Sequence, residues 1–448
     1  MTIAYPTSDK QQYLLDVVNH VCAEASLHQA AASVFISQST GYDLSYADGA
    51  VESLEYKGGY TVHIILYVGS KQVSFSSADI RKAPLTAAVE NLISKVPYVE
   101  ADPYVGLPDP ARLAYESMDL NLYTPNTHNM DHYIAQLAAS ETLAHAADSR
   151  ITRCESLSFS SNAAYYLYGN TLDLRAAYCT SYYSLSSCLL ATDTHGDMHR
   201  DYAYQAGRSP SAVADHEAIV QRAVRRTVSR LGAKTMPSTQ ASVLFAPRVA
   251  KSLVGAFLQA ISGGNLYRKA SFLLDAMDKP VFNDFVDIID DPHILAGLGS
   301  SFCDGEGVAT TCRPLVSQGV LTGYLLGSYS ARRLGLASTG NAGGAHNICV
   351  STNTTGGEKA MLSTLYTGLY VTELMGQGVD LLTGDYSKGA FGYWVEKGVI
   401  GSPIQTITIA GNLADMFRQV EAIGDDIDYS SAIRTGSWLI PNMTIAGQ

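Results

Sequence analysis

The chain has 448 residues, of which 46% are hydrophobic and 16% are charged, and its formal net charge is −12. This length can bury a large core in about two to four domains, and 28 tyrosines favour a chain rich in β-strands. The acidic balance argues against direct binding of nucleic acid, because negative charge repels the phosphate backbone.

The sequence also predicts a cytoplasmic protein. The seven cysteines form no CxxC pair and are odd in number, which indicates reduced thiols. Met1–Lys10 lacks the basic start and the apolar stretch of a signal peptide. The clearest apolar run, Val62–Val68, is too short to cross a membrane and is typical of a strand. We therefore expect no membrane association.

The N-terminal part predicts a run of strands between two helices. Apolar residues at helical spacing indicate a helix over residues 9–27, and a second helix is expected over residues 85–94. Four strands are expected between them as a meander, beginning at residues 34–36. The predicted turns of this meander are Asp48-Gly49, Gly58-Gly59 and Gly69-Ser70.

A middle segment is expected after four prolines that fall between Pro97 and Pro110 and predict a domain boundary. A helix over residues 131–147 begins this segment, and Ser209-Pro210-Ser211 is expected to cap another helix that ends near residue 231. Between these helices, strands are predicted with hairpin tips at Gly169-Asn170 and His195-Gly196-Asp197. Four arginines of the later helix share one face: Arg222, Arg225, Arg226 and Arg230. We interpret this face as solvated, and a face that docks a partner is the second interpretation.

The C-terminal part predicts mostly short strands after a boundary at residues 232–240. Residues 242–245 are typical of a buried strand and residues 249–261 of a helix, and later hairpin turns are expected at Gln318-Gly319 and Lys397-Gly398. The predicted fold class is therefore α+β. It comprises an N-terminal β-meander with flanking helices (1–110), a middle α/β segment (111–235) and a C-terminal antiparallel β-sandwich or barrel-like domain (236–448).

Candidate metal ligands are few. The one His-Glu pair, His216-Glu217, lacks the second histidine of a zincin helix, because Val220 and Gln221 stand where that histidine would be. His128 and His132 could share a helical face, but they are more typical of a helix start capped by Thr127 or Asn129. Alternation along a strand could bring four ligands together to bind a metal, although a polar hairpin tip is the simpler interpretation: His195, Asp197, His199 and Asp201.

Glycine-punctuated segments in the C-terminal half carry a family resemblance. These segments turn often and approach other groups closely, as glycine permits. They include Tyr267-Arg268-Lys269, Asn341-Ala342-Gly343-Gly344, Gly376-Gln377-Gly378, Thr383 to Gly389, Phe391 to Gly398, Ile409 to Leu413 and Pro441 to Gly447. As a set, they strongly resemble the TldD/PmbA family, in its TldE (PmbA) branch.

The resemblance implies where zinc would be held in the TldD branch, which uses an HExxxH motif. By gapless matching, the two histidines of that motif fall on Gly255 and Ala260, and its glutamate falls on Ala256. A cysteine ligand near the tail would fall near Thr435. None of these four side chains is an imidazole, carboxylate or thiolate, so the resemblance implies no zinc or other cofactor in this chain.

The resemblance therefore implies a subunit of a heterodimeric TldD/TldE-type metalloprotease, with zinc in the TldD-type partner. Such complexes degrade unfolded proteins or process peptide precursors. Five residues of the signature segments are candidates for contact with an unfolded peptide: Arg268, Lys269, Asp385, Tyr386 and Ser387. Two alternatives stay open. One is a stand-alone homodimer of the gyrase-modulator type that binds a peptide or protein without catalysis. The other is a self-sufficient metalloenzyme that uses the strand from His195 to Asp201.

Overall fold

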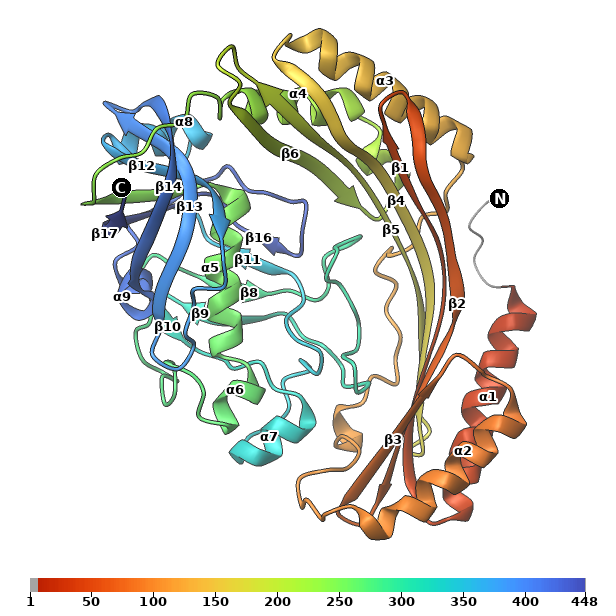
Figure 1. The fold of residues 1–448 in the computed structure, drawn as a ribbon. Coiled ribbons are helices and arrows are strands. Elements are labelled where there is room, and N and C mark those ends of the chain that lie inside the picture. Colours follow the sequence, from red (N-terminus) through yellow and green to blue (C-terminus); the bar gives the residue numbers. More distant parts are fainter. Residues whose placement is uncertain (1–6, 448) are drawn as a thin grey trace.

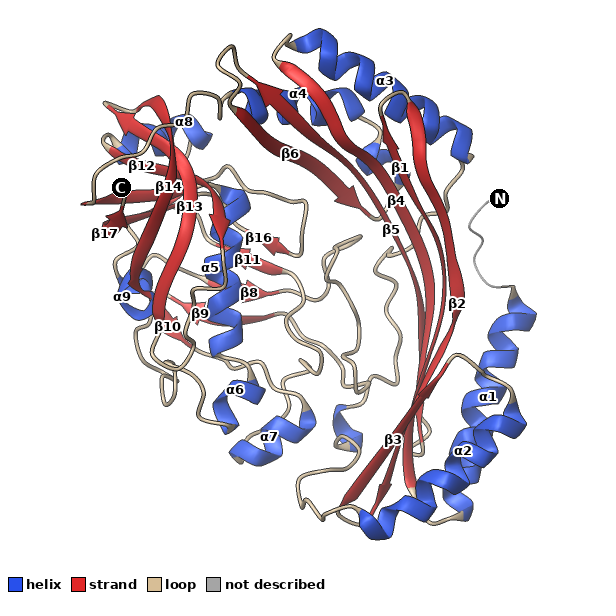
Figure 2. Cartoon of the chain, in the orientation of Figure 1, coloured by secondary structure: helices blue, strands red, loops and turns tan. Residues whose placement is uncertain are grey.

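The computed structural model describes residues 7–447. A long curved sheet carries helices on its outer face, and the C-terminal part lies on the concave side of that sheet (Figure 1). Strands dominate both parts, and helices lie at the two ends of the curved sheet and within the C-terminal part (Figure 2). The predicted α+β class is confirmed.

The curved sheet joins the N-terminal and middle segments. Its strand order is β3-β2-β1-β4-β5-β6, and each neighbouring pair is antiparallel. Because β1 pairs with β4, the predicted meander and the predicted middle segment share one sheet; the domain boundaries themselves stay predictions. The strands are β1 (Ala31–Ala47), β2 (Ala50–Val68), β3 (Lys71–Ser77), β4 (Ile151–Asn170), β5 (Arg175–Thr192) and β6 (Met198–Gly207).

The meander has three strands rather than the four expected. The hairpin turns at Asp48-Gly49 and Gly69-Ser70 are confirmed. The turn predicted at Gly58-Gly59 is wrong, because β2 continues through both glycines and pairs them with Thr40 and Ser39 of β1. Long-range pairing of the strand therefore outweighs the local preference of two adjacent glycines for a turn.

Two pairs of helices cover the outer face of the curved sheet. One pair packs on the strands near the N-terminus, where Val17, Val18 and Val21 enter the core, and the other packs on β4, β5 and β6. The capping expected at Asn129 is confirmed, since its side chain accepts from the His132 N–H. The pairs are α1 (Ser8–Leu27) with α2 (Lys82–Lys95), and α3 (Met130–Ala147) with α4 (His216–Val228).

The cap predicted for α4 is wrong. Ser209 caps only the short 3-10 helix η3 (Pro210–Val213), and α4 begins separately with Asp215 as its cap. Two further short 3-10 helices, η1 (Val96–Tyr98) and η2 (Pro110–Arg112), lie in the proline-rich segment.

A small barrel forms the centre of the C-terminal part. Its sheet has the order β14-β13-β12-β7-β17-β15, and an additional pairing of β14 with β17 closes five of these strands. The barrel-like prediction is confirmed, although β7 and β12 run parallel. The strands are β7 (Thr239–Phe245), β12 (Gly368–Met375), β13 (Asp385–Glu396), β14 (Val399–Asn412), β15 (Ala422–Ile423) and β17 (Trp438–Ala446).

A second, smaller sheet and the remaining helices pack around the barrel. The sheet order is β10-β9-β8-β11-β16, and the hairpin turns at Gln318-Gly319 and Lys397-Gly398 are confirmed. These elements are β8 (Ile288–Asp290), β9 (Arg313–Ser317), β10 (Val320–Leu321), β11 (Ile348–Val350), β16 (Ile433–Arg434), α5 (Pro247–Ala260), α6 (Gly263–Tyr267), α7 (Ser328–Leu334), α8 (Gly357–Leu365) and α9 (Leu413–Arg418).

In residues 7–447, no helix is both long enough and apolar enough to span a membrane. Part of Met1–Lys10, the segment considered above for a signal peptide, lies outside the described residues.

Candidate functional site

Helix α5 lies between the barrel and the concave face of the curved sheet (Figure 1). It follows β7 directly and begins with Pro247, whose fixed φ and missing N–H suit the first turn of a helix. Its apolar residues pack into the C-terminal core, including Leu253, Val254 and Phe257. The helix thus exposes only a narrow face toward the rest of the molecule.

The positions matched to the TldD zinc motif lie on different faces of α5. Gly255 is partly exposed, and a side chain added there would meet no atom within 4 Å. Ala260 is fully buried in the core, and Ala256 is 7% exposed. In a regular helix, positions 255 and 260 point about 140° apart, because each residue advances about 100°. These residues do not fit a zinc ion, because none of them has a side chain that can coordinate a metal.

Thr435 lies close to α5, because β16, which precedes it, packs against that helix. Its hydroxyl is fully buried and accepts a hydrogen bond from the Trp438 Nε1–H at 2.7 Å. The structure thus brings Thr435 to the same region as Gly255, while its side chain has a structural partner.

The face of α5 that carries Gly255 also carries two mostly buried cations that the sequence analysis did not single out. Arg248, Lys251 and Gly255 lie on one face, since they are spaced by three and four residues. Lys251 Nζ lies 2.6 Å from an Asp428 carboxylate oxygen and also donates to Ser430 Oγ at 3.3 Å. The helical spacing of these residues is the signal that could have found them.

Arg248 and Arg230 hold the carboxylate of Asp201 between the curved sheet and the barrel. Arg248 donates two hydrogen bonds to Asp201, at 2.7 and 2.8 Å, and Arg230 lies 3.2 Å from the same group. Burial opposes ionisation of Asp201, but the hydrogen bonds and charge of Arg248, together with the charge of Arg230, hold its pKa below the ordinary value of 3.8. Asp201 is therefore an ionised structural link between β6 and the start of α5.

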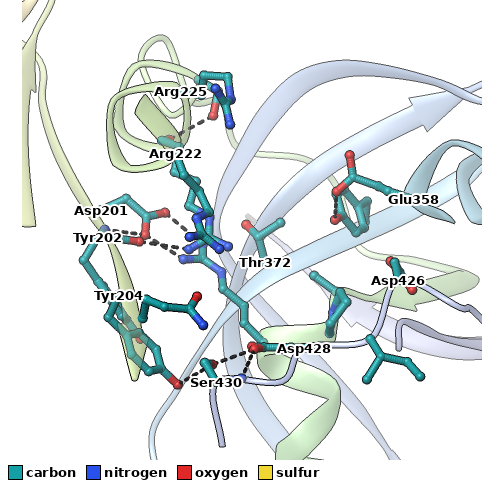
Figure 3. A pocket seen from close by; sticks show the side chains of 18 of the residues that line it. Asp201, Tyr202, Tyr204, Arg222, Arg225, Glu358, Thr372, Asp426, Asp428 and Ser430 are labelled. Carbon is teal, nitrogen blue, oxygen red and sulfur yellow. Dashed lines mark hydrogen bonds and ion pairs between the residues drawn. The ribbon is translucent and has the colours of Figure 1, made fainter. Parts of the chain in front are cut away.

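A cleft of about 740 Å³ opens beside this link, between the curved sheet and the barrel (Figure 3). One wall comes from β6 and α4, and the other comes from α8, β12 and the loop that contains Asp426 and Asp428. Three of the arginines interpreted above as a solvated face line this cleft: Arg222, Arg225 and Arg226. Arg225 is exposed, and Arg222 and Arg226 are partly exposed, so a solvated face remains compatible with the structure for these three residues. The interpretation is wrong for Arg230, which is buried and paired with Asp201.

The metal ligands proposed along β6 are not brought together. His195 and Asp197 are exposed at the tip of the β5–β6 hairpin, where Asp193 accepts hydrogen bonds from both of their backbone N–H groups. Asp201 lies further along the strand and is engaged by two arginines. The hairpin tip predicted as the simpler interpretation is confirmed, and the strand offers no support for a self-sufficient metalloenzyme.

The histidines near the starts of α3 and α4 have ordinary structural surroundings. Glu217 lies in the first turn of α4, where a negative charge complements the helix dipole, and it is exposed. The rings of His128 and His132 stack with their centroids 4.1 Å apart. Burial is the main cause that lowers the pKa of His132, with a further contribution from the charge of His128.

Among the described residues, one group has metal-ligand atoms close together: Glu141, His145 and Cys154 lie within 4.8 Å of one another. The group lies at the interface of α3 and β4, in the other body of the molecule from α5. Burial, with the charges of Glu141 and Asp48, raises the pKa of the Cys154 thiol to about 12, so this thiol is protonated at neutral pH.

The five predicted peptide-contact residues gather at one end of the barrel. The Phe272 N–H donates to the Leu381 carbonyl at 2.7 Å, which brings the segment after α6 next to the segment before β13. Arg268, Lys269, Asp385 and Ser387 are exposed, whereas Tyr386 is 2% exposed and belongs to the core. None of the five lines the cleft, and their contact with a peptide stays a prediction.

Comparisons with known proteins agree over the whole chain. A family model described as the PmbA/TldA metallopeptidase C-terminal domain matches residues 238–447, and the central-domain model matches residues 125–231. Metalloprotease PmbA of Escherichia coli O157:H7 is 41% identical over 100% of this chain and 99% of its own length. The Metalloprotease PmbA homolog of Haemophilus influenzae is 37% identical over 98% and 97%. The chain therefore belongs to the PmbA/TldD family of metallopeptidases.

Solved structures show the same fold. A proposed modulator of DNA gyrase from Bacteroides thetaiotaomicron superposes with a TM-score of 0.90 at 23% identity, over 99% of this chain and 100% of that chain. TldE from Thermococcus kodakarensis superposes with a TM-score of 0.85 at 17% identity, over 97% and 100%. The curved sheet and the closed barrel are thus shared features of these proteins.

Proposed function

We propose that this chain is the zinc-free subunit of a heterodimeric metalloprotease of the TldD/TldE type, which degrades unfolded proteins or processes peptide precursors. A TldD-type partner would supply the zinc ion and the catalytic glutamate. This chain would supply part of the surface that holds the peptide. The proposal rests on membership of the PmbA/TldD family and on the residues of α5.

The observation that carries the proposal is the composition of α5 at the positions matched to the TldD motif. Gly255, Ala256 and Ala260 have no lone pair that could bind zinc and no base that could activate water. The face of the same helix that carries Gly255 also carries Arg248 and Lys251, which are paired with Asp201 and Asp428. Guanidinium and ammonium groups are not zinc ligands.

Co-purification with a TldD-type subunit tests the proposal. We expect a stable heterodimer that cleaves an unfolded peptide, whereas this chain alone should contain zinc far below stoichiometry and show no peptidase activity. A wild-type chain that forms no complex with any TldD-type subunit tested, and that binds peptides as a homodimer, would contradict the proposal and favour the stand-alone binding protein.

The zinc measurement needs one control. Glu141, His145 and Cys154 could take up metal during purification, since their ligand atoms lie within 4.8 Å of one another. Zinc should therefore also be measured in the Cys154→Ala variant, which removes the thiol and leaves α5 unchanged. Zinc that persists in this variant at one ion per chain would count against the proposal.

A further inference from the structure

The arginines that line the cleft are not all engaged by protein groups. Arg222, Arg225 and Arg226 are spaced by three and four residues, so they share one face of α4. Arg226 donates to the Tyr202 carbonyl at 3.1 Å. Within residues 7–447, none of the three has a carboxylate within ion-pair distance, in contrast to Arg230 and Arg248.

The surroundings of Arg226 favour an added anion. Burial is the main cause that lowers its pKa. The positive charges of Arg248 and Arg222 lower it further, while the negative charge of Asp201 opposes this shift. A guanidinium that is partly removed from water and repelled by its neighbours is stabilised when a negative group binds beside it. The cleft thus holds an excess of unsatisfied positive charge on its α4 wall.

The acidic groups of the cleft do not neutralise these arginines. Asp201 is shared by Arg230 and Arg248, and Asp428 is paired with Lys251. Glu358 accepts a hydrogen bond from the Tyr370 hydroxyl at 2.6 Å. Asp201, Asp428 and Glu358 thus have partners other than the three arginines of α4.

The barrel wall offers polar atoms of a different kind. One carboxylate oxygen of Asp426 accepts hydrogen bonds from the Ser437 N–H and the Ser437 hydroxyl. Its other carboxylate oxygen is buried without a hydrogen-bond partner in the described structure. The Thr372 hydroxyl is likewise buried without a partner in the described part of the chain. Both residues line the cleft, and a buried polar atom left unpaired carries a free-energy cost. The barrel wall of the cleft therefore contains polar as well as apolar residues.

We propose that Arg222, Arg225 and Arg226 bind a carboxylate of a peptide ligand that enters this cleft. Guanidinium groups suit this role, because each presents a planar fork of donors that matches the two oxygens of a carboxylate. The carboxylate comes from the C-terminus of the peptide or from an acidic side chain. The inference rests on the proposed function, since it assigns this chain a part in holding the substrate.

Fluorescence anisotropy tests the inference with the full-length chain. The probe is an unstructured ten-residue peptide of Gly, Ala and Ser with a dye at its N-terminus and a free C-terminal carboxylate. A second peptide ends in an amide, and a third is amidated but contains one Asp. We expect the plain amidated peptide to bind about tenfold more weakly or worse, as loss of one charge-assisted hydrogen bond predicts. Recovery of affinity with the Asp peptide would assign the site to acidic side chains, and no recovery would assign it to the C-terminus.

Variants test whether the three arginines cause the preference for the peptide with a free carboxylate. The triple variant Arg222→Gln, Arg225→Gln, Arg226→Gln should bind the carboxylate peptide no better than the amidated one, and Arg226→Lys should keep part of the difference. Arg418→Gln is the matched control, because Arg418 is exposed on α9, outside the cleft. Circular dichroism and the melting temperature of each variant should match those of the wild type.

Two outcomes would overturn the inference. One is an unchanged carboxylate preference in the folded triple variant. The other is displacement of the carboxylate and amidated peptides alike by inorganic phosphate, which would indicate a general anion site. Complex formation between the triple variant and the TldD-type subunit is measured in parallel. If the wild-type chain forms the complex but shows no carboxylate preference, this inference alone is contradicted. If the wild-type chain forms no complex, the proposed function is contradicted.

Discussion

The ion pair between Asp201 and Arg248 joins the curved sheet to the barrel, so its removal should destabilise the protein. The side chain of Asp201 is 4% exposed, and those of Arg248 and Arg230 are 15% and 10% exposed. Solvent therefore screens these charges weakly. In Asp201→Asn, a neutral amide replaces the carboxylate and one of its two acceptor atoms becomes a donor that faces a guanidinium.

Breaking a buried ion pair costs about 3–5 kcal/mol, because the remaining charge stays buried and uncompensated. The lower end of this range applies here, since Arg230 also pairs with Glu373 at 2.6 Å and keeps that partner. We expect Asp201→Asn to lower the free energy of unfolding by about 3 kcal/mol. The pKa of Asp201 lies below its ordinary value of 3.8, so the contribution of the ion pair is present at neutral pH and is lost only in acid, below that value.

Urea unfolding measures this loss with two probes. Fluorescence of Trp394 and Trp438 reports on the barrel, because both lie on its strands, and far-UV circular dichroism reports on the whole chain. The control is Asp48→Asn, which removes a surface pair with Arg153 whose side chains are 65% and 53% exposed. That change should cost less than about 1 kcal/mol. Equal losses in the two variants would refute the reasoning about burial.

Three further changes test other parts of the structure. Gly255→Ala should raise the free energy of unfolding by up to about 1 kcal/mol, because alanine favours a helix interior and its methyl group would meet no atom within 4 Å. A lower free energy of unfolding in urea would show that the methyl group clashes with neighbouring atoms. Glu217→Gln should leave the peptidase activity of the heterodimer nearly unchanged, and near-total loss in the cleavage assay would revive His216-Glu217 as a catalytic pair. Burial raises the pKa of Asp304 to about 6, so the native state should bind a proton between about pH 6 and pH 4 that the unfolded state does not bind. Relative to Asp304→Asn, wild-type stability should therefore rise by up to about 3 kcal/mol as pH falls through that range, and a parallel pH dependence of the two proteins would contradict the assignment.

Local patterns predicted most of the helices and several hairpins. The apolar spacing over residues 9–27 and 131–147 corresponds to α1 and α3, and the turn at Asp48-Gly49 follows from the preference of such a dipeptide for a left-handed turn. These features depend on neighbours in the sequence. The family resemblance and the barrel-like C-terminal fold could also be predicted from the sequence, because the glycine-punctuated segments occur as a set.

Contacts between distant residues could not be predicted in this way. The pairing of β1 with β4, the closure of the barrel by β14 and β17, and the parallel pairing of β7 with β12 depend on tertiary packing. The link between Asp201 and Arg248 joins the two bodies of the molecule. The alternation of possible ligands along β6 therefore could not show that Asp201 binds an arginine rather than a metal. For the same reason, the sequence could not show that Arg230 is buried against Asp201, or that Arg222, Arg225 and Arg226 line a cleft.

The most direct test of the account is anomalous X-ray scattering at the zinc edge from crystals of this chain in complex with a TldD-type subunit. The account predicts a zinc peak among side chains of the partner, and none at Gly255, Ala256, Ala260 or Thr435. A strong zinc peak held at those positions by side chains of this chain would contradict it.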